Sequence, residues 1–230
     1  MQTVWEHIHQ ERLLMFLHNF VTTPDLEAIT EPTGRVYIAP NGERLPSVTT
    51  VLGRLSKSKK GLLEWRARVG DTKADYIMRA AATRGTAVHE ILEQYLLNNP
   101  EYRKGVPPLP MGHFLDLKPI LDKNISEIFG LELALYSYEL GVAGRMDMAC
   151  NWAGIPSIVD FKTSNRLKTR DYIENYFIQA CAYAYMLEQL TGLNTRKLVI
   201  LIMVEHEQPQ IFIEERADWE ARMFEVFKTS

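Results

Sequence analysis

The chain is poor in cysteine and contains no long hydrophobic run. Cys150 and Cys181 are the only cysteines among its 230 residues, too few for a four-thiolate iron–sulfur cluster or zinc site. Both lie in apolar segments, so we interpret them as buried thiols. No apolar stretch approaches the roughly 20 residues of a membrane helix, and the first residues lack the basic and then apolar pattern of a signal peptide. We therefore expect a soluble, cytoplasmic protein without a membrane partner.

Internal repeats, low-complexity tracts and long linkers are also absent, which predicts a single domain over residues 1–230. The composition, 46% hydrophobic and 24% charged, is ordinary for a globular protein with a sizeable core. We expect a mainly helical cap with a hairpin over residues 1–130, an α/β core that carries the chemistry over 131–215, and a terminal helix over 216–230.

The pattern of apolar residues predicts the elements of this domain. Helices are expected over residues 1–20, 60–69, 72–82, 84–98, 112–126 and 171–190 and from 218 onward, with a proline-rich loop at 107–110. Asn-Gly at 41–42 predicts a hairpin between residues 35–39 and a strand from 44. Further strands are expected over residues 131–137, 142–150, 157–162, 198–204 and 210–214. Strands before and after a long crossover helix predict an α/β fold, with a central mixed β-sheet flanked by helices and a helical N-terminal elaboration.

Positive charge is concentrated in one segment. Residues 54–84 contain nine basic and three acidic residues, a net charge of +6, whereas the whole chain has −3 and the remainder therefore −9. A basic segment on an acidic body suits a protein that binds nucleic acid on one side. The alternative is a solvated helical face. The candidate contacts with phosphates and bases are Lys59, Lys60, Trp65, Arg66, Arg68 and Arg84.

A cluster of hydroxyl groups precedes this basic segment. Ser47, Thr49 and Thr50 lie in the sequence Pro-Ser-Val-Thr-Thr-Val-Leu at 46–52. Their hydroxyls can contact phosphates or cap the start of a helix, and capping is the simpler interpretation.

Carboxylates on neighbouring predicted strands form the main candidate site. Because a strand places residues i and i+2 on one face, Asp160 and Lys162 project together. Asp147 lies between two methionines on the preceding strand, where an unpaired charge is expensive. Such a set can bind a hard divalent cation and support phosphodiester hydrolysis. Glu132 is a further candidate carboxylate, although an exposed strand glutamate is the ordinary interpretation.

Two predicted helices add polar residues to this set. His89 lies at the border of the apolar stripe of its helix and can face a site, although a single border histidine is usually structural. Gln179 and Tyr183 lie four residues apart on one flank of an apolar helix. The amide of Gln179 needs a hydrogen-bond partner, either backbone or substrate.

The order of these motifs resembles a known family. Gly-x-x-x-His-Glu at 85–90, Gly-x-x-Asp at 144–147, Asp-x-Lys at 160–162 and Gln-x-x-x-Tyr at 179–183 are similar to the RecB-type branch of the PD-(D/E)XK nuclease superfamily. The resemblance spans residues 33–205 and implies a restriction-endonuclease-like core. The segment at 46–52 further resembles small phage exonucleases and the mitochondrial genome maintenance exonuclease of that branch, so the cytoplasm would be that of the host if the source is a phage.

The resemblance implies a role for each matching residue. It implies that His89, Asp147 and Asp160 hold Mg²⁺ or Mn²⁺, that Lys162 assists the attacking water, and that Gln179 and Tyr183 shape the site. We add the main-chain carbonyl of Phe161 as a metal ligand and Glu132 as a further site carboxylate. Two departures are the absence of cluster-forming cysteines and Val159 in place of the motif's proline.

Together these features predict a metal-dependent DNA exonuclease that acts on single-stranded DNA or DNA ends in replication, recombination or repair. No helicase segment is present, so unwinding would come from a partner such as a helicase, polymerase or recombination protein. A structure-selective or sequence-specific endonuclease on the same fold is the first alternative. A nucleic-acid-binding module without catalysis is the second.

Overall fold

The structure, a computed structural model, describes residues 16–228, except for the side chains of residues 56–59. The helix predicted over residues 1–20 lies for the most part outside the described residues. Its last part is not helical, because the backbone N–H and C=O of Phe16 both bond to the side-chain amide of Asn98 and the next residues form strand β1 (Leu17–His18). None of the described helices is long and apolar enough to cross a membrane.

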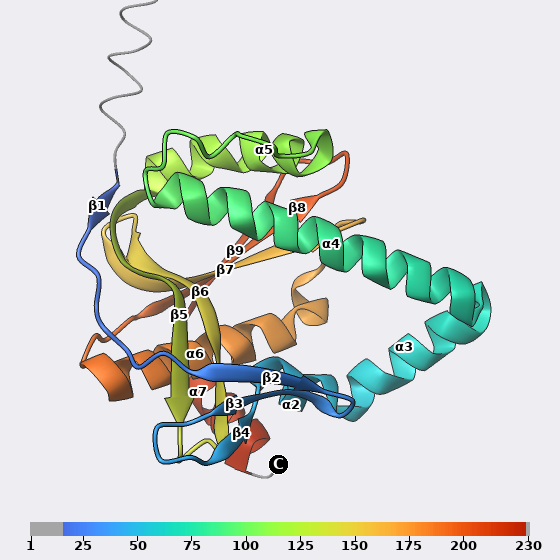
Figure 1. The fold of residues 1–230 in the computed structure, drawn as a ribbon, viewed down its shortest axis with the longest axis horizontal. Coiled ribbons are helices and arrows are strands. Elements are labelled where there is room, and N and C mark those ends of the chain that lie inside the picture. Colours follow the sequence, from blue (N-terminus) through green and yellow to red (C-terminus); the bar gives the residue numbers. More distant parts are fainter. Residues whose placement is uncertain (1–15, 229–230) are drawn as a thin grey trace, which may run out of the picture.

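A six-stranded mixed sheet forms the centre of the molecule (Figure 1). Its strands, in spatial order, are β1, β5 (Ile125–Ser137), β6 (Val142–Trp152), β7 (Ile155–Ser164), β8 (Lys197–Val204) and β9 (Gln210–Glu215). The β1–β5 and β7–β8 pairs are parallel and the other three are antiparallel. Helix α6 (Glu174–Thr191), which follows the short 3₁₀ turn Arg170–Tyr172, connects the parallel strands β7 and β8.

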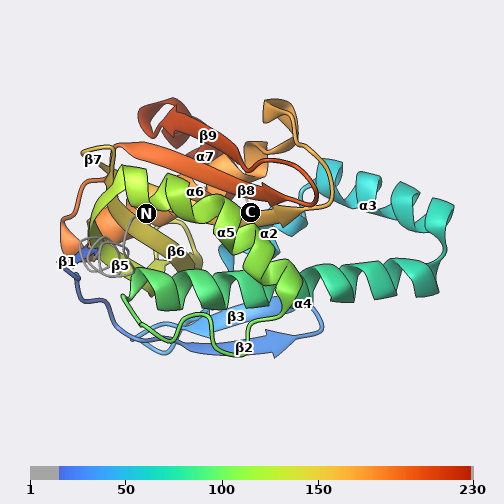
Figure 2. The ribbon, with the colours of Figure 1, turned by 90° about the horizontal axis from the view of Figure 1, so that it is seen from above.

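Helices cover both faces of this sheet (Figures 1 and 2). Helices α6 and α7 (Ala217–Lys228) pack on one face, and α4 (Asp71–Leu96) and α5 (Pro108–Asn124) pack on the other. The buried residues of β7 alternate accordingly, with Ile158 facing α6 and with Val159 and Phe161 facing α4 and α5. Asp160 therefore projects towards α6. The predicted fold class, a central mixed sheet flanked by helices, is confirmed.

The N-terminal part of the chain adds a small second sheet. Strands β2 (Glu27–Glu31), β3 (Gly34–Ile38) and β4 (Arg44–Pro46) are antiparallel. The hairpin predicted at Asn-Gly is confirmed as the β3–β4 connection, whereas β2 was not predicted. Helix α2 (Val48–Gly53) follows directly and packs against the α6 side of the core.

Helix α3 (Ser56–Val69) and the first half of α4 project from the body of the molecule (Figures 1 and 2). We call residues 56–82 the arm. The prediction of two separate helices over 72–82 and 84–98 is wrong, because α4 is continuous through Gly85. A glycine inside a helix costs only about 1 kcal/mol relative to alanine, which the packing of the second half of α4 on the sheet offsets.

Two other boundaries differ from the sequence prediction. Helix α5 begins at Pro108 inside the predicted loop, because a proline in the first helical turn lacks only an N–H group that would have no helical partner. Strand β5 begins six residues before the predicted position 131, and its pairing with β6 is irregular between residues 125 and 130. Such irregular pairing weakens the alternation of apolar residues from which strands are predicted.

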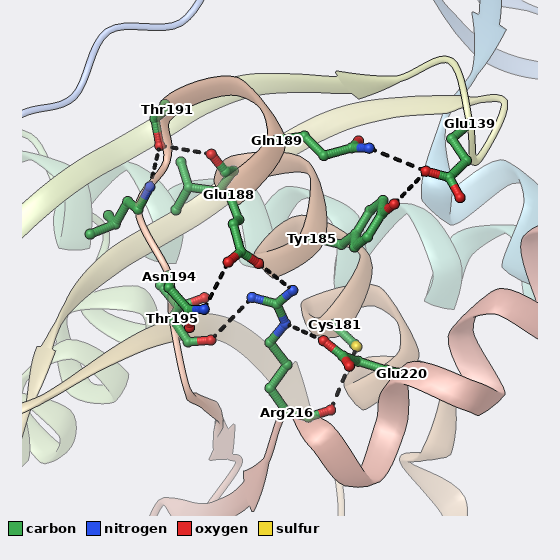
Figure 3. A network of polar contacts seen from close by, with 12 residues as sticks. Glu139, Cys181, Tyr185, Glu188, Gln189, Thr191, Asn194, Thr195, Arg216 and Glu220 are labelled. Carbon is green, nitrogen blue, oxygen red and sulfur yellow. Dashed lines mark hydrogen bonds and ion pairs between the residues drawn. The ribbon is translucent and has the colours of Figure 1, made fainter.

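A buried arginine attaches α7 to the body (Figure 3). The guanidinium of Arg216 lies 2.6 Å from the carboxylate of Glu188 on α6 and 2.9 Å from that of Glu220 on α7, and it donates to the carbonyl of Thr195. On the same side, Tyr185 donates a hydrogen bond to Glu139. These contacts hold α6 in position on the side that faces away from the sheet. The opposite side of α6 packs on the sheet.

Candidate metal centre

Strands β6 and β7 separate at the centre of the sheet. Their pairing runs from Trp152 and Ile155 to Met148 and Val159 and then ends. Beyond this point β7 continues beside β8 and β6 continues beside β5. Oδ2 of Asp147 accepts a hydrogen bond from the backbone N–H of Phe161 at 2.8 Å. One carboxylate therefore spans the fork between the two strands.

The fork coincides with a distortion of strand β5. Leu131 packs on the α4 side of the sheet, whereas Leu133 and Leu135 pack on the α6 side. A regular strand would place all three leucines on one face, so β5 changes face between Leu131 and Leu133. Between them Glu132 has a φ of +48°, a left-handed conformation that is uncommon for any residue except glycine.

The same change of face occurs on β6. Met146 packs towards α6 and Met148 towards α4 and α5. Their partners on β5 are Leu133 and Leu131, so Asp147 stands opposite Glu132. Backbone strain of this kind persists only where the surrounding structure determines it, and it is concentrated at functional sites.

His89 on α4 lies above these two carboxylates. Its Nε2 is 3.0 Å from the carbonyl oxygen of Phe161, and a carbonyl only accepts, so Nε2 carries a proton. Nδ1 lies 3.6 Å from Asp147 and 3.9 Å from Glu132. Burial opposes protonation of the ring, but the two carboxylates outweigh it and raise the pKa of His89 above its usual value. In place of a second proton, Nδ1 can offer its lone pair to a metal ion.

The donor set of His89, Glu132 and Asp147 fits one divalent cation. One ligand atom from each residue lies within 4.8 Å of the others, a spacing that can hold a metal ion. The cavity between them has a volume of about 10 Å³ and apolar walls that include Leu92 and Leu131. This volume corresponds to about one water molecule or ion.

Asp160 and Lys162 form a buried pair on the α6 side of the fork. Asp160 is 1% exposed, and its Oδ2 lies 2.5 Å from the ammonium of Lys162. Burial raises the pKa of Asp160 to about 6, with Lys162 opposing and Asp147 adding to the increase. The pKa of Lys162 is also raised, because Asp160 and Asp147 outweigh the effect of burial. Asp160 does not belong to the close three-residue set, so its predicted role as a metal ligand stays a prediction.

Gln179 and Tyr183 both face this pair from α6. Nε2 of Gln179 donates to Oδ1 of Asp160 at 3.0 Å, a side-chain partner that the sequence analysis did not consider. A contact of Gln179 with substrate stays a prediction. Tyr183 is buried, and burial raises its pKa well above the usual value. A Cβ on Gly144 would lie 2.8 Å from the ring of Tyr183. The glycine of Gly-x-x-Asp therefore allows Tyr183 to approach β6.

The structure adds Tyr176 on α6 to the residues near the site, and the sequence analysis did not name it as a candidate. Tyr176 is half-buried, and the ammonium of Lys162 lies 5.3 Å from the centre of its ring. The spacing of Tyr176, Gln179 and Tyr183 at i, i+3 and i+7 could have indicated a shared face.

The hydroxyl cluster at 46–52 serves as a helix cap. Oγ of Ser47 accepts a hydrogen bond from the backbone N–H of Thr50 and contacts the hydroxyl of Thr49. The hydroxyl of Thr50 bonds to both backbone groups of Arg35. The capping interpretation is confirmed. Ser47 is buried, whereas Thr49 is exposed, and contact of these residues with nucleic acid stays a prediction.

The predicted nucleic-acid contacts on the arm differ in their surroundings. Arg68 is exposed, Lys60 is exposed with Glu64 at 4.0 Å, and Trp65 is half-buried. Arg66 is paired with two acids of α4, Asp71 at 2.9 Å and Asp75 at 2.7 Å. The side chain of Lys59 lies outside the described residues.

Arg84 lies beyond the arm, where α4 reaches the body. Its guanidinium is 3.4 Å from Glu205 and also donates to Asn165. These two residues follow strands β8 and β7. Arg84 therefore connects α4 to the ends of the parallel strands.

Comparisons with known proteins give distant structural matches. No family model and no curated protein matches the chain. Among solved structures, the chain is similar to a "putative exonuclease" from Eubacterium rectale, with 13% identity and a TM-score of 0.39 over 64% of this chain and 68% of that one. It is also similar to SSO0001, with 16% identity and a TM-score of 0.31 over 63% and 73%. These likenesses are too distant to carry a functional conclusion.

Proposed function

We propose that the protein is a metal-dependent deoxyribonuclease and, more narrowly, an exonuclease that acts on single-stranded DNA or DNA ends. One observation carries this proposal. His89 on α4, Asp147 on β6, and Asp160 and Lys162 on β7 converge on the fork between β6 and β7. The order of their motifs resembles the RecB-type nucleases, whose restriction-endonuclease-like core suits the sheet and helices described above.

His89, Glu132 and Asp147 would hold the ion, with Asp160 and the carbonyl of Phe161 as further candidates. Carboxylate oxygens and one imidazole suit Mg²⁺ or Mn²⁺. Such an ion supplies Lewis acidity at the phosphoryl group and acidifies water at neutral pH.

The remaining residues would orient the reactants. Lys162, held by the carboxylate of Asp160, places a positive charge where negative charge develops on the phosphate during hydrolysis. Gln179 donates to Asp160 and so limits its rotation. Tyr183 closes the α6 side of the site.

The arm would bind the DNA strand. The segment 54–84 carries +6 of charge and includes exposed Lys60, Arg68 and Tyr76. Phosphates attract the cations, and bases stack on aromatic rings without regard to sequence. A helicase, polymerase or recombination protein would supply the unpaired strand.

Digestion of labelled single-stranded DNA tests the activity. We expect hydrolysis of 5′- and 3′-labelled strands with Mg²⁺ or Mn²⁺, none with a chelator, and none by Asp160→Ala. Hydrolysis by the variant at the wild-type rate would refute the role of Asp160. Absence of hydrolysis by the wild type with either metal would favour a binding module without catalysis.

Substrate topology distinguishes an exonuclease from an endonuclease. An exonuclease needs an end, so we expect linear single-stranded DNA to be degraded and a covalently closed circle of the same sequence to remain intact. Cutting of the circle at a similar rate would support the endonuclease alternative.

A further inference from the structure

Glu93 lies one helical turn after His89 on α4 and has no assigned role. Residues four apart share a helix face, and Glu93 lines the same cavity of about 10 Å³ as His89, Glu132 and Asp147. No hydrogen bond or ion pair joins its side chain to another residue of the described chain. A half-buried glutamate thus lines an ion-sized cavity, and its carboxylate has no partner among the described residues.

The electrostatic surroundings of Glu93 favour a cation. Burial raises the pKa of its carboxyl group, and the charge of Glu132 raises it further, while Arg145 opposes the change. Arg145 is already bonded to the backbone carbonyl of Glu132 and pairs with Asp25. Three acidic residues, Glu93, Glu132 and Asp147, therefore line one small cavity together with His89. Ionised carboxylates in this proximity repel one another unless a cation lies between them.

We propose that Glu93 is a fourth donor to the metal centre, an inference that rests on the metal ion of the proposed function. Glu93 does not belong to the three-residue set within 4.8 Å. Its side chain has three rotatable bonds, so a change of rotamer can bring an oxygen to the cavity. Three carboxylates and one imidazole form a harder ligand set than two carboxylates and one imidazole, and this favours Mn²⁺ and Mg²⁺ over softer ions.

Titration of the protein with Mn²⁺ in the absence of DNA, followed by electron paramagnetic resonance, tests this assignment. Glu93→Gln removes one donor charge but keeps the shape of the side chain. We expect the Kd for Mn²⁺ to increase about tenfold or more. The matched control is Glu90→Gln, the same change at an exposed position of α4, for which we expect a change of less than about twofold. An unchanged Kd in Glu93→Gln, or equal changes in both variants, would overturn the proposal.

Thermal unfolding distinguishes a metal-binding role of Glu93 from a purely structural one. With chelator present, Glu93→Gln should unfold at the wild-type temperature or above it, because a repulsion is removed. Mn²⁺ should raise the unfolding temperature of Glu93→Gln by less than it raises that of the wild type. No saturable Mn²⁺ binding to the wild type would overturn the metal centre and this inference together. Binding that Glu93→Gln weakens, in a protein that hydrolyses no DNA, would refute the proposed nuclease activity alone.

Discussion

At the scale of single residues, the pair of Asp160 and Lys162 has the shortest charge-to-charge distance of the site, 2.5 Å. Both charges are largely removed from water, with Asp160 1% exposed and the Lys162 side chain 22% exposed. A buried ion pair often contributes little net stability, whereas removal of one partner leaves an uncompensated charge. The two residues should therefore be strongly coupled in stability as well as in function.

A double-mutant cycle measures this coupling. Lys162→Met leaves the carboxylate of Asp160 buried and unpaired, so we expect the free energy of unfolding to fall by about 3 kcal/mol. Asp160→Asn combined with Lys162→Met removes both charges and should recover most of this loss, without recovery of DNA hydrolysis. Urea unfolding of the wild type, both single variants and the double variant gives the four values. A double variant no more stable than Lys162→Met would contradict the prediction.

At the scale of elements, helix α5 carries a buried histidine outside the candidate metal centre. His113 is 5% exposed, and its Nε2 has no hydrogen-bond partner in the described part of the chain. Burial and then the charge of Arg84 lower the pKa of His113 below its usual value. The neutral imidazole is therefore the form that the fold accommodates.

The lowered pKa of His113 determines how the stability of the protein changes with pH. The unfolded chain takes up a proton on His113 at about pH 6.5, whereas the folded protein takes it up only at lower pH. The free energy of unfolding should therefore decrease as the pH falls below about 6.5. His113→Gln lacks this group, so its decrease between about pH 7.5 and pH 5.5, measured by urea unfolding, should be smaller than that of the wild type. Equal decreases in the free energy of unfolding of the two proteins would show that His113 does not contribute to the pH dependence of stability.

The elements also show how far the sequence predicts this structure. The period-two pattern of β7 correctly places Asp160 and Lys162 on one face, because this face depends only on the strand itself. The change of face at Glu132 could not be predicted, since it depends on the pairing of two strands that separate beside it. The continuity of α4 through Gly85 likewise depends on packing against the sheet. The hydrogen bond from Gln179 to Asp160 required the position of α6 over β7.

At the scale of the whole molecule, charge is divided between the arm and the body. Lys60 and Arg68 are exposed residues of α3, and α3 projects from the body of the molecule (Figure 2). We expect Lys60→Glu with Arg68→Glu to weaken binding of single-stranded DNA and to reduce the dependence of log affinity on log salt by about 0.7 for each lost phosphate contact. Fluorescence anisotropy at several salt concentrations measures both quantities.

A matched charge reversal controls this experiment. Lys123→Glu changes an exposed lysine on α5, outside the arm, and should leave the affinity nearly unchanged. Mn²⁺ binding should be the same in all three proteins, because none of these residues lines the metal cavity. Equal weakening by Lys123→Glu would mean that the protein attracts DNA through its overall charge and not through the arm.

The continuous helix α4 connects the arm to the candidate metal centre. From Asp71, at the start of α4 in the arm, to His89 the helix rises about 27 Å at 1.5 Å per residue, with no proline to bend it. Its inner end carries the imidazole of His89 beside the carboxylates of Glu132 and Asp147. If the arm binds DNA as proposed, a strand that tilts the outer end of α4 would also shift Nδ1 of His89 relative to Asp147, so DNA binding and the geometry of the candidate metal centre would be coupled through one rigid helix.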